Sequence, residues 1–154
     1  MLHCIKKTQF LKSDLQTVWN FMSRPENLSK ITPDHMGFHV LTDVQGVEMY
    51  PGQIIEYKVS PLFGINLHWV TEITHVHNKA FFVDEQRFGP YAFWHHQHLL
   101  NEVNGGVEMV DVVHYKIPFG ILGKIANAIF IRKKLEDIFE HRFHVLNEVF
   151  NNKN

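Results

Sequence analysis

The final part of the chain carries apolar residues at helical spacing and predicts one long helix over residues 121–150. At about 100° of turn per residue these positions form one broad stripe, opposite a face that carries charged residues. The stripe consists of Ala128, Ile131, Leu135, Ile138, Phe139, Leu146 and Val149. Such a stripe has to be buried, and only the segments upstream can supply the surface. We therefore expect a sheet that packs against this helix.

Arg142 interrupts the apolar stripe between Leu135 and Leu146, so its charge would face the interior. Either its stem carries the guanidinium to an edge of the helix, or the interior contains carboxylates and water. The second alternative predicts a partly polar hollow between helix and sheet.

The segments before this helix begin with a strand and two short helices. Residues 3–11 alternate loosely between apolar and polar and predict the strand. Ser13 and Gln16 form a capping-box pattern that opens the first helix. Ser23 repeats the start signal for a second short helix, which runs to about Lys30.

Six strand-like segments follow, separated by short turns. They cover residues 37–42, 53–60, 65–77, 80–88, 92–103 and 106–117. Connections this short cannot join parallel neighbours, so the strands form an antiparallel meander. The predicted fold is α+β, a single domain over residues 1–154 with element order β-α-α-β6-α. A curved antiparallel sheet of about seven strands wraps round the C-terminal helix and encloses a cavity.

Asn104-Gly105 is the strongest short hairpin signal in the chain and is typical of a two-residue type I′ turn. It places His98 opposite Asp111, and the period of two along a strand sends His96 and Trp94 to the same interior face. Asp111 is therefore predicted to be a carboxylate on the apolar face of the sheet. The full register pairs Val103 with Gly106, Leu100 with Met109, His98 with Asp111, His96 with Val113 and Trp94 with Tyr115.

The preceding hairpin leaves two alternatives open. A three-residue loop at 89–91 directs residues 84 and 86 to the interior, whereas a two-residue loop directs residues 85 and 87 there. The interior residues are Asp84 and Gln86, opposite His96 and Trp94, in the first case and Glu85 and Arg87 in the second.

Composition and charge narrow the class of protein. The chain has 154 residues, of which 45% are hydrophobic and 20% charged, as in an ordinary soluble globular domain. A net charge of −1 gives no electrostatic reason to expect nucleic acid as a partner. The single cysteine, Cys4, excludes an internal disulfide and fits a reducing compartment. The sequence shows neither a signal-peptide core nor a membrane-spanning apolar stretch, so we predict a cytoplasmic protein.

Several short motifs along the chain occur together in one known superfamily. They are Val18-Trp19-x-Phe21, Pro25-x-Asn27-Leu28, Ile31-Thr32-Pro33, Phe82-Val83-Asp84-Glu85-Gln86, Gly89-Pro90-Tyr91, Trp94-x-His96-x-His98, Met109-x-Asp111-x-Val113-x-Tyr115, Pro118-x-Gly120-x-Leu122-Gly123 and Ile138-Phe139-x-x-Arg142. With them the sequence resembles, over essentially its whole length, the SRPBCC superfamily of START-type lipid carriers, birch-pollen-allergen-like proteins and polyketide cyclases. The resemblance implies the helix-grip fold and a ligand-binding domain. It also favours the three-residue loop at 89–91 and carries a matching arginine at Arg142.

The histidines on one predicted strand invite a metal-site interpretation. His96, His98 and Glu102 copy the spacing of the first cupin metal-binding motif, and alternate imidazoles on a strand can bind one ion. Against this, Glu102 lies at the strand end, the expected glycine is displaced and the second cupin motif is missing. The alternative is that the histidines form hydrogen bonds with cavity carboxylates. We therefore predict no metal and no cofactor.

His98 opposite Asp111 is also the candidate for acid–base catalysis, because the carboxylate would fix the imidazole tautomer. The alternative, which we favour, is a buried polar pair that shapes a pocket. No serine or cysteine is placed beside this pair as a nucleophile. The predicted ligand-binding residues are Tyr57, Trp69, Thr71, Asp84, Gln86, Trp94, His96, His98, Asp111, Tyr115 and Arg142.

Two interior carboxylates would repel each other unless a cation lay between them. A guanidinium can bridge both through its forked donors, so we predict that Arg142 lies between Asp84 and Asp111. His96 and His98 would take the remaining acceptor sites of this network.

The predicted function is the binding of a small, mainly hydrophobic molecule with polar groups, lipid-like or polyketide-like. One competing class is a cyclase- or dehydratase-like enzyme that uses the interior residues His98, His96, Asp84 or Asp111. Another is an interaction module without a ligand, in which the apolar stretch 119–131 contacts a membrane or a second subunit in a homodimer. Core packing and a cavity portal are the other roles that we consider for this stretch.

Overall fold

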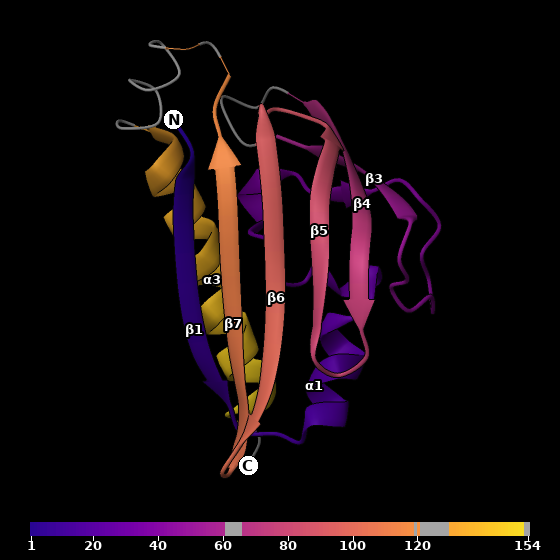
Figure 1. The fold of residues 1–154 in the computed structure, drawn as a ribbon, viewed down its shortest axis with the longest axis vertical. Coiled ribbons are helices and arrows are strands. Elements are labelled where there is room, and N and C mark those ends of the chain that lie inside the picture. The colour runs from indigo at the N-terminus through magenta and orange to yellow at the C-terminus, as the bar shows by residue number, and fades with distance from the viewer. Residues whose placement is uncertain (61–65, 119, 121–129, 153–154) are drawn as a thin grey trace.

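The computed structural model describes residues 1–60, 66–118, 120 and 130–152, and these contain one curved sheet of seven strands (Figure 1). The strand order across the sheet is β1-β7-β6-β5-β4-β3-β2, and every neighbouring pair is antiparallel. The strands are β1 His3–Leu11, β2 His39–Val40, β3 Gln53–Val59, β4 Leu67–His77, β5 Phe81–Phe88, β6 Phe93–Val103 and β7 Gly106–Lys116. The α+β class and the antiparallel meander are thus confirmed.

Strand β2 is the one clear departure from the predicted strands in this part of the chain. Residues 37–42 were expected to be extended, but only two of them form the strand. Gly37 lies at a left-handed φ of 51°, which prevents an earlier start. At the other end the amide of Glu56 donates to the Thr42 hydroxyl at 2.8 Å rather than to a strand carbonyl. A side chain therefore takes the place of the next bond in the ladder.

The predicted register of the last hairpin is confirmed. His98 pairs with Asp111, and Asp111 is only 3% exposed. Asp84 pairs with His96, so the alternative that directs residues 84 and 86 inward is also the observed one. The opposite alternative fails because Arg87 is exposed and forms an ion pair with Glu85 at 3.1 Å.

Helix α1 (Leu15–Met22) begins at a different cap from the predicted one. The N-cap is Asp14, not Ser13. Asp14 Oδ1 accepts a hydrogen bond from the Thr17 amide at 2.9 Å, and its Oδ2 accepts one from the Thr17 hydroxyl at 2.7 Å. A carboxylate at this position satisfies free helix amides and also interacts favourably with the positive end of the helix dipole.

The second predicted helix is wrong. Its place is taken by a single 3₁₀ turn at Pro25–Asn27. Arg24 has an extended backbone and no side-chain cap, so no α-helical start forms there. The Asn27 side chain donates to the carbonyl of Phe21 at 2.9 Å, and such a local side-chain bond competes with helix continuation. A further 3₁₀ turn at Asp34–Met36 leads into β2.

Helix α3 (Arg132–Phe150) is the described part of the predicted long helix, and residues 121–129 of that prediction lie outside the described residues. The helix lies along the inner side of the sheet beside β1 and β7 (Figure 1). Its buried residues recur every three or four positions: Leu135, Phe139, Arg142, Leu146 and Phe150. The Gln9 side chain of β1 donates to the carbonyl of Phe143 at 2.8 Å and ties the helix to the sheet edge.

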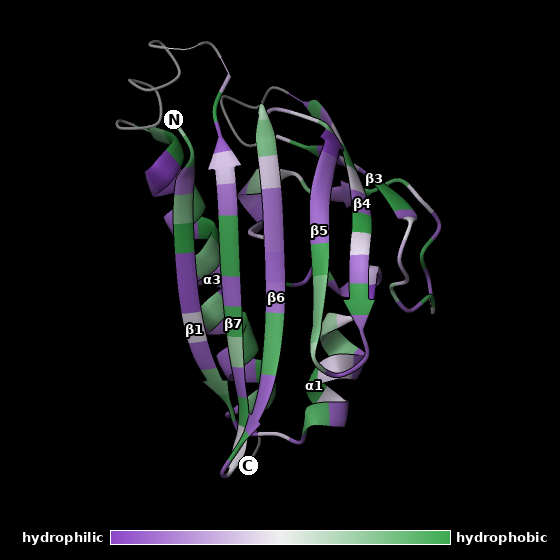
Figure 2. Cartoon of the chain, viewed as in Figure 1, coloured by the Kyte–Doolittle hydropathy of each residue, from purple (hydrophilic) through white to green (hydrophobic). Residues whose placement is uncertain are grey.

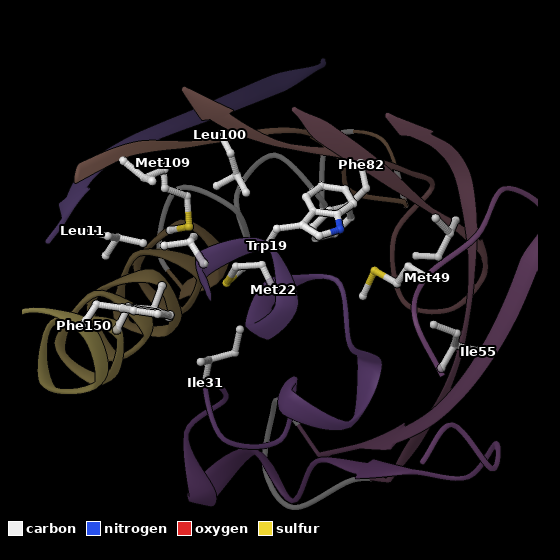
Figure 3. Packing of buried hydrophobic residues seen from close by; sticks show 14 of the residues in the cluster. Leu11, Trp19, Met22, Ile31, Met49, Ile55, Phe82, Leu100, Met109 and Phe150 are labelled. Carbon is white, nitrogen blue, oxygen red and sulfur yellow. The ribbon is translucent and has the colours of Figure 1, made fainter. Parts of the chain in front are cut away.

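The core lies between the sheet and the two helices, in two groups of side chains. The larger one packs α1 against the sheet, with Trp19 and Met22 below Leu100 and Met109 (Figure 3). The smaller one joins α3 to β1, β6 and β7. Hydrophobic and hydrophilic residues alternate in short bands along β7, as expected for a sheet with one buried face, whereas β6 carries a long hydrophilic block (Figure 2). Residues of both groups also line the cavity described below.

Candidate functional site

A cavity of about 550 Å³ lies between the concave face of the sheet and α3. Its wall is mainly apolar, with residues from β3, β4, β5, β6 and α3. Polar side chains from β5, β6 and α3 gather in one part of the wall: Asp84, His96, His98 and Arg142. Alternation along the strands explains this arrangement, because His96 and His98 are two residues apart and point to the same face.

Asp84 connects the strands of the polar wall. Its Oδ1 accepts a hydrogen bond from the indole N–H of Trp94 at 3.1 Å, and its Oδ2 accepts one from His98 Nε2 at 2.8 Å. His96 Nδ1 lies 3.3 Å from the same Oδ2. Both oxygens of this carboxylate are therefore already engaged by groups of β6.

Asp111 lies behind the histidines and does not line the cavity. Its Oδ1 is 2.9 Å from His96 Nε2 and 3.2 Å from Arg142 Nη2. Arg142 Nη2 also donates to His98 Nδ1 at 3.0 Å. The predicted network exists, with one correction: Arg142 contacts Asp111 directly, whereas its connection to Asp84 runs through His98.

The contact with Arg142 distinguishes the two histidines. A guanidinium only donates, so its contact favours His98 Nδ1 as the acceptor and the ring proton on Nε2, directed at Asp84. His98 is then neutral. Both histidines have a carboxylate oxygen within 3.3 Å of each ring nitrogen, but the guanidinium contact among the described hydrogen bonds is to His98, so the imidazolium form is favoured on His96. Two carboxylates, one guanidinium and one imidazolium give the network no net charge.

The pKa shifts agree with this assignment. Burial alone would raise the pKa of Asp84 and Asp111, but the histidines, and for Asp111 chiefly Arg142, outweigh it and lower both. Burial would lower the pKa of His96, but the two aspartates raise it. Burial, His96 and Arg142 together outweigh the aspartates and lower the pKa of His98. The pKa shifts of these two neighbouring imidazoles, whose ring centroids lie 3.7 Å apart, are thus in opposite directions.

Most of the sequence-predicted residues lie in the cavity wall. These are Tyr57, Trp69, Thr71, Asp84, Trp94, His96, His98 and Arg142. Gln86, Asp111 and Tyr115 do not line it. Gln86 instead accepts from the amide of Tyr91 at 3.1 Å and donates to its carbonyl at 2.7 Å, which fastens the loop after β5. Tyr115 is 1% exposed and belongs to the core next to Trp94.

Comparison with solved structures identifies the architecture. TTHA0849 from Thermus thermophilus superimposes with a TM-score of 0.72 at 12% identity over 95% of each chain. A START superfamily protein from Mycobacterium smegmatis gives 0.70 at 12% identity over 97% of each chain. Ara h 8.0201 gives 0.58 at 10% identity, over 96% of this chain and 99% of its own.

The chain has the helix-grip fold of SRPBCC-type proteins. No protein-family model and no curated protein sequence matches it. The similarity is therefore one of fold.

One cluster among the described residues has the spacing that a metal site requires. It consists of Asp84, His96 and His98, each of which offers one ligand atom, and these atoms lie within 4.8 Å of one another. Two features favour proton sharing over metal binding here. His98 Nε2 and Asp84 Oδ2 already form a hydrogen bond of 2.8 Å, which an ion bound by both residues would replace. The Arg142 guanidinium also lies 3.0 Å from His98 and would repel a cation. Glu102, the third residue of the cupin-like spacing, is exposed at the end of β6. The absence of a metal remains a prediction.

Sequence reasoning missed two features of the site. Phe82 stacks on His98 with ring centroids 4.0 Å apart, and it was recognised only as part of a motif. The indole N–H of Trp69 is buried with no hydrogen-bond partner among the described residues. Strand periodicity gives the face of Trp69 but not the direction of its N–H, so no sequence signal could have found the second feature.

The apolar stretch 119–131 lies mostly outside the described residues, and its predicted roles stay predictions. Within the described ranges, no helix combines the length and apolar character needed to cross a bilayer.

Proposed function

We propose that this protein binds a small, mainly hydrophobic molecule with polar groups, lipid-like or polyketide-like, in the cavity between sheet and helix. The observation that carries the proposal is the cavity itself: about 550 Å³, with apolar walls and one cluster of buried polar side chains. Ligand pockets in proteins commonly span about 300–1,000 Å³ and combine apolar walls with a few placed polar groups. The helix-grip fold supports the proposal by analogy, since one structural neighbour is a START superfamily protein.

The direct test is displacement of a fluorescent apolar probe, N-phenyl-1-naphthylamine, with a variant that fills the cavity. Ile138 lies in the cavity wall on α3, so Ile138→Trp should weaken probe binding at least about tenfold. Val145 is also half-buried on α3 but is not in the wall, and Val145→Trp is the matched control. Equal weakening, or none, in the two variants would place the probe outside the cavity and overturn the proposal.

An acid–base enzyme of the cyclase or dehydratase type is the second candidate. The opposite pKa shifts of His96 and His98 favour it, because paired groups with separated protonation states suit proton transfer. Against it, both ring nitrogens of His98 are already engaged, and Asp111 does not line the cavity. Turnover of a retained molecule that disappears in His98→Ala would favour the enzyme.

A cytoplasmic location is a further proposal, which the single cysteine, Cys4, supports because it fits a reducing compartment. Homodimerisation through the stretch 119–131 is a further proposal, which size-exclusion chromatography with light scattering can test.

A further inference from the structure

A row of polar side chains crosses the inner face of the sheet from β3 to β5. Tyr57 on β3 pairs with Trp69, which is two positions from Thr71 on β4. Asp84 on β5 pairs with Ile73, which is two positions from Thr71 in the other direction. Residues that pair directly, or that lie two apart on one strand, share a face of the sheet. Tyr57, Thr71 and Asp84 are therefore diagonal neighbours, and all three line the cavity.

The hydroxyls of Tyr57 and Thr71 form a pair at one end of this row. Burial and the charge of Asp84 raise the pKa of Tyr57, and a hydrogen bond with Thr71 offsets this rise only in part. The phenol therefore keeps its proton. Two hydroxyls carry two protons, and one hydrogen bond between them uses one of these. One O–H of the pair is left to donate to a ligand.

Asp84 supplies an acceptor beside this pair. Its side chain is 17% exposed, more than any other side chain of the buried network. A carboxylate has about four acceptor sites, of which Trp94, His96 and His98 occupy three. One acceptor site is therefore left for a donor on a ligand.

A hydroxyl is the ligand group that matches a donor and an acceptor side by side, because it accepts and donates at one oxygen. An ether or ketone oxygen can accept but cannot donate to Asp84. A ligand carboxylate would place a second negative charge beside Asp84. A ligand ammonium cannot accept, and it would add a positive charge to a wall that already holds Arg142 and Lys134. Either ion would be desolvated in a mainly apolar cavity, which is unfavourable.

We propose that Tyr57, Thr71 and Asp84 form a recognition site for an alcohol group of the ligand, an aliphatic or phenolic hydroxyl. This inference rests on the proposed function and specifies its ligand. The ligand oxygen accepts from the hydroxyl pair, its O–H donates to the carboxylate, and its hydrocarbon part lies along the apolar walls.

A series with one common octyl chain tests the inference on the full-length protein. The compounds are 1-octanol, 1-methoxyoctane, nonane, nonanoate and octylamine, each measured by displacement of N-phenyl-1-naphthylamine. The ether keeps the oxygen of the alcohol and lacks its donor, and nonane lacks both. We expect 1-octanol to bind about tenfold more tightly than 1-methoxyoctane, which is about 1.4 kcal/mol. Nonanoate and octylamine should bind more weakly than the alcohol.

The double variant Tyr57→Phe/Thr71→Val removes both hydroxyls and nearly keeps the shapes of the two side chains. It should weaken the binding of 1-octanol about tenfold and leave the affinity for nonane within about twofold. Tyr50→Phe/Thr74→Val is the matched control, because it makes the same two chemical changes at residues that do not line the cavity. The control should keep the affinities of the wild type.

The outcomes separate the two proposals. Equal affinity of the wild type for 1-octanol and 1-methoxyoctane overturns this inference and leaves the proposed function intact, and that comparison needs no variant. Equal weakening of 1-octanol and nonane in the double variant also overturns it, because the loss is then one of cavity shape. So does tightest binding of octylamine, or of nonanoate with a loss in Lys134→Met. If neither the probe nor any compound binds, the proposed function fails together with the inference.

Discussion

Arg142 shows at the scale of a single residue how a buried charge is accommodated. Its side chain is 7% exposed on an otherwise apolar helix face, and it contacts Asp111 at 3.2 Å and His98 at 3.0 Å. Removal of one partner of a buried pair leaves an uncompensated charge, which costs on the order of 3–5 kcal/mol. We therefore expect Arg142→Met to lower the free energy of unfolding by about that amount in urea titrations.

Two companion variants make this prediction specific. Lys133→Met, at an exposed neighbouring position, should change the stability by no more than about 0.5 kcal/mol. Asp111→Asn added to Arg142→Met should recover part of the loss, because it removes the unpaired carboxylate. An equal change in the free energy of unfolding for Arg142→Met and Lys133→Met would show that the arginine is solvated.

The two histidines should respond to pH in opposite directions. The pKa of His96 is raised in the folded protein, so its contribution to stability is present below about pH 6.5 and is lost as the pH rises through the folded value. The pKa of His98 is lowered, so its contribution is present above about pH 6.5 and is lost as the pH falls through the folded value.

Urea unfolding of the wild type, His96→Gln and His98→Gln at several pH values measures this. The stability difference between wild type and His96→Gln should shrink towards alkaline pH, and that for His98→Gln should shrink towards acid pH. The steepest slope for one group is about 1.4 kcal/mol per pH unit. The same direction in both variants would contradict the proton assignment.

At the scale of elements, the strands were more predictable than the short helices. Asn104-Gly105 fixes the turn geometry, and the period of two then determines the face of every residue on β6 and β7, which is why Asp111 could be placed inside. The start signal at Ser23 failed because Asn27 forms a local bond that the pattern does not reveal. Gln86 was placed on the correct strand position, yet its long side chain turns to the loop backbone at Tyr91.

Gly106 tests the junction of β1 and β7. A Cβ at this position would meet the backbone carbonyl oxygen of Leu11 and would lie 2.9 Å from the ring of Phe10. Gly106→Ala should therefore destabilise the protein by about 1–3 kcal/mol, as measured by urea titration. Glu102→Ala, at an exposed position of the same hairpin, is the control and should stay within about 0.5 kcal/mol. Equal losses of stability in the two variants would mean that β1 can move away from β7 without destabilising the protein.

At the scale of the whole molecule, α1 and α3 pack against the curved sheet, and a hollow remains between the sheet and α3. The sequence predicted this hollow from one charged residue on an apolar stripe, together with inward-facing aspartates and histidines. It could not give the volume, because that depends on how far the sheet curves from the helix. Nor could it show that Arg142 contacts Asp111 directly and reaches Asp84 only through His98.

Native mass spectrometry of the protein purified from its own host can show whether this hollow holds a ligand. We predict a retained small molecule on the wild-type protein, present on Val145→Trp and lost from Ile138→Trp, because only the last substitution fills the cavity. A wild-type protein that carries no molecule, or a molecule retained equally by Ile138→Trp, would contradict the proposal that this cavity binds the ligand.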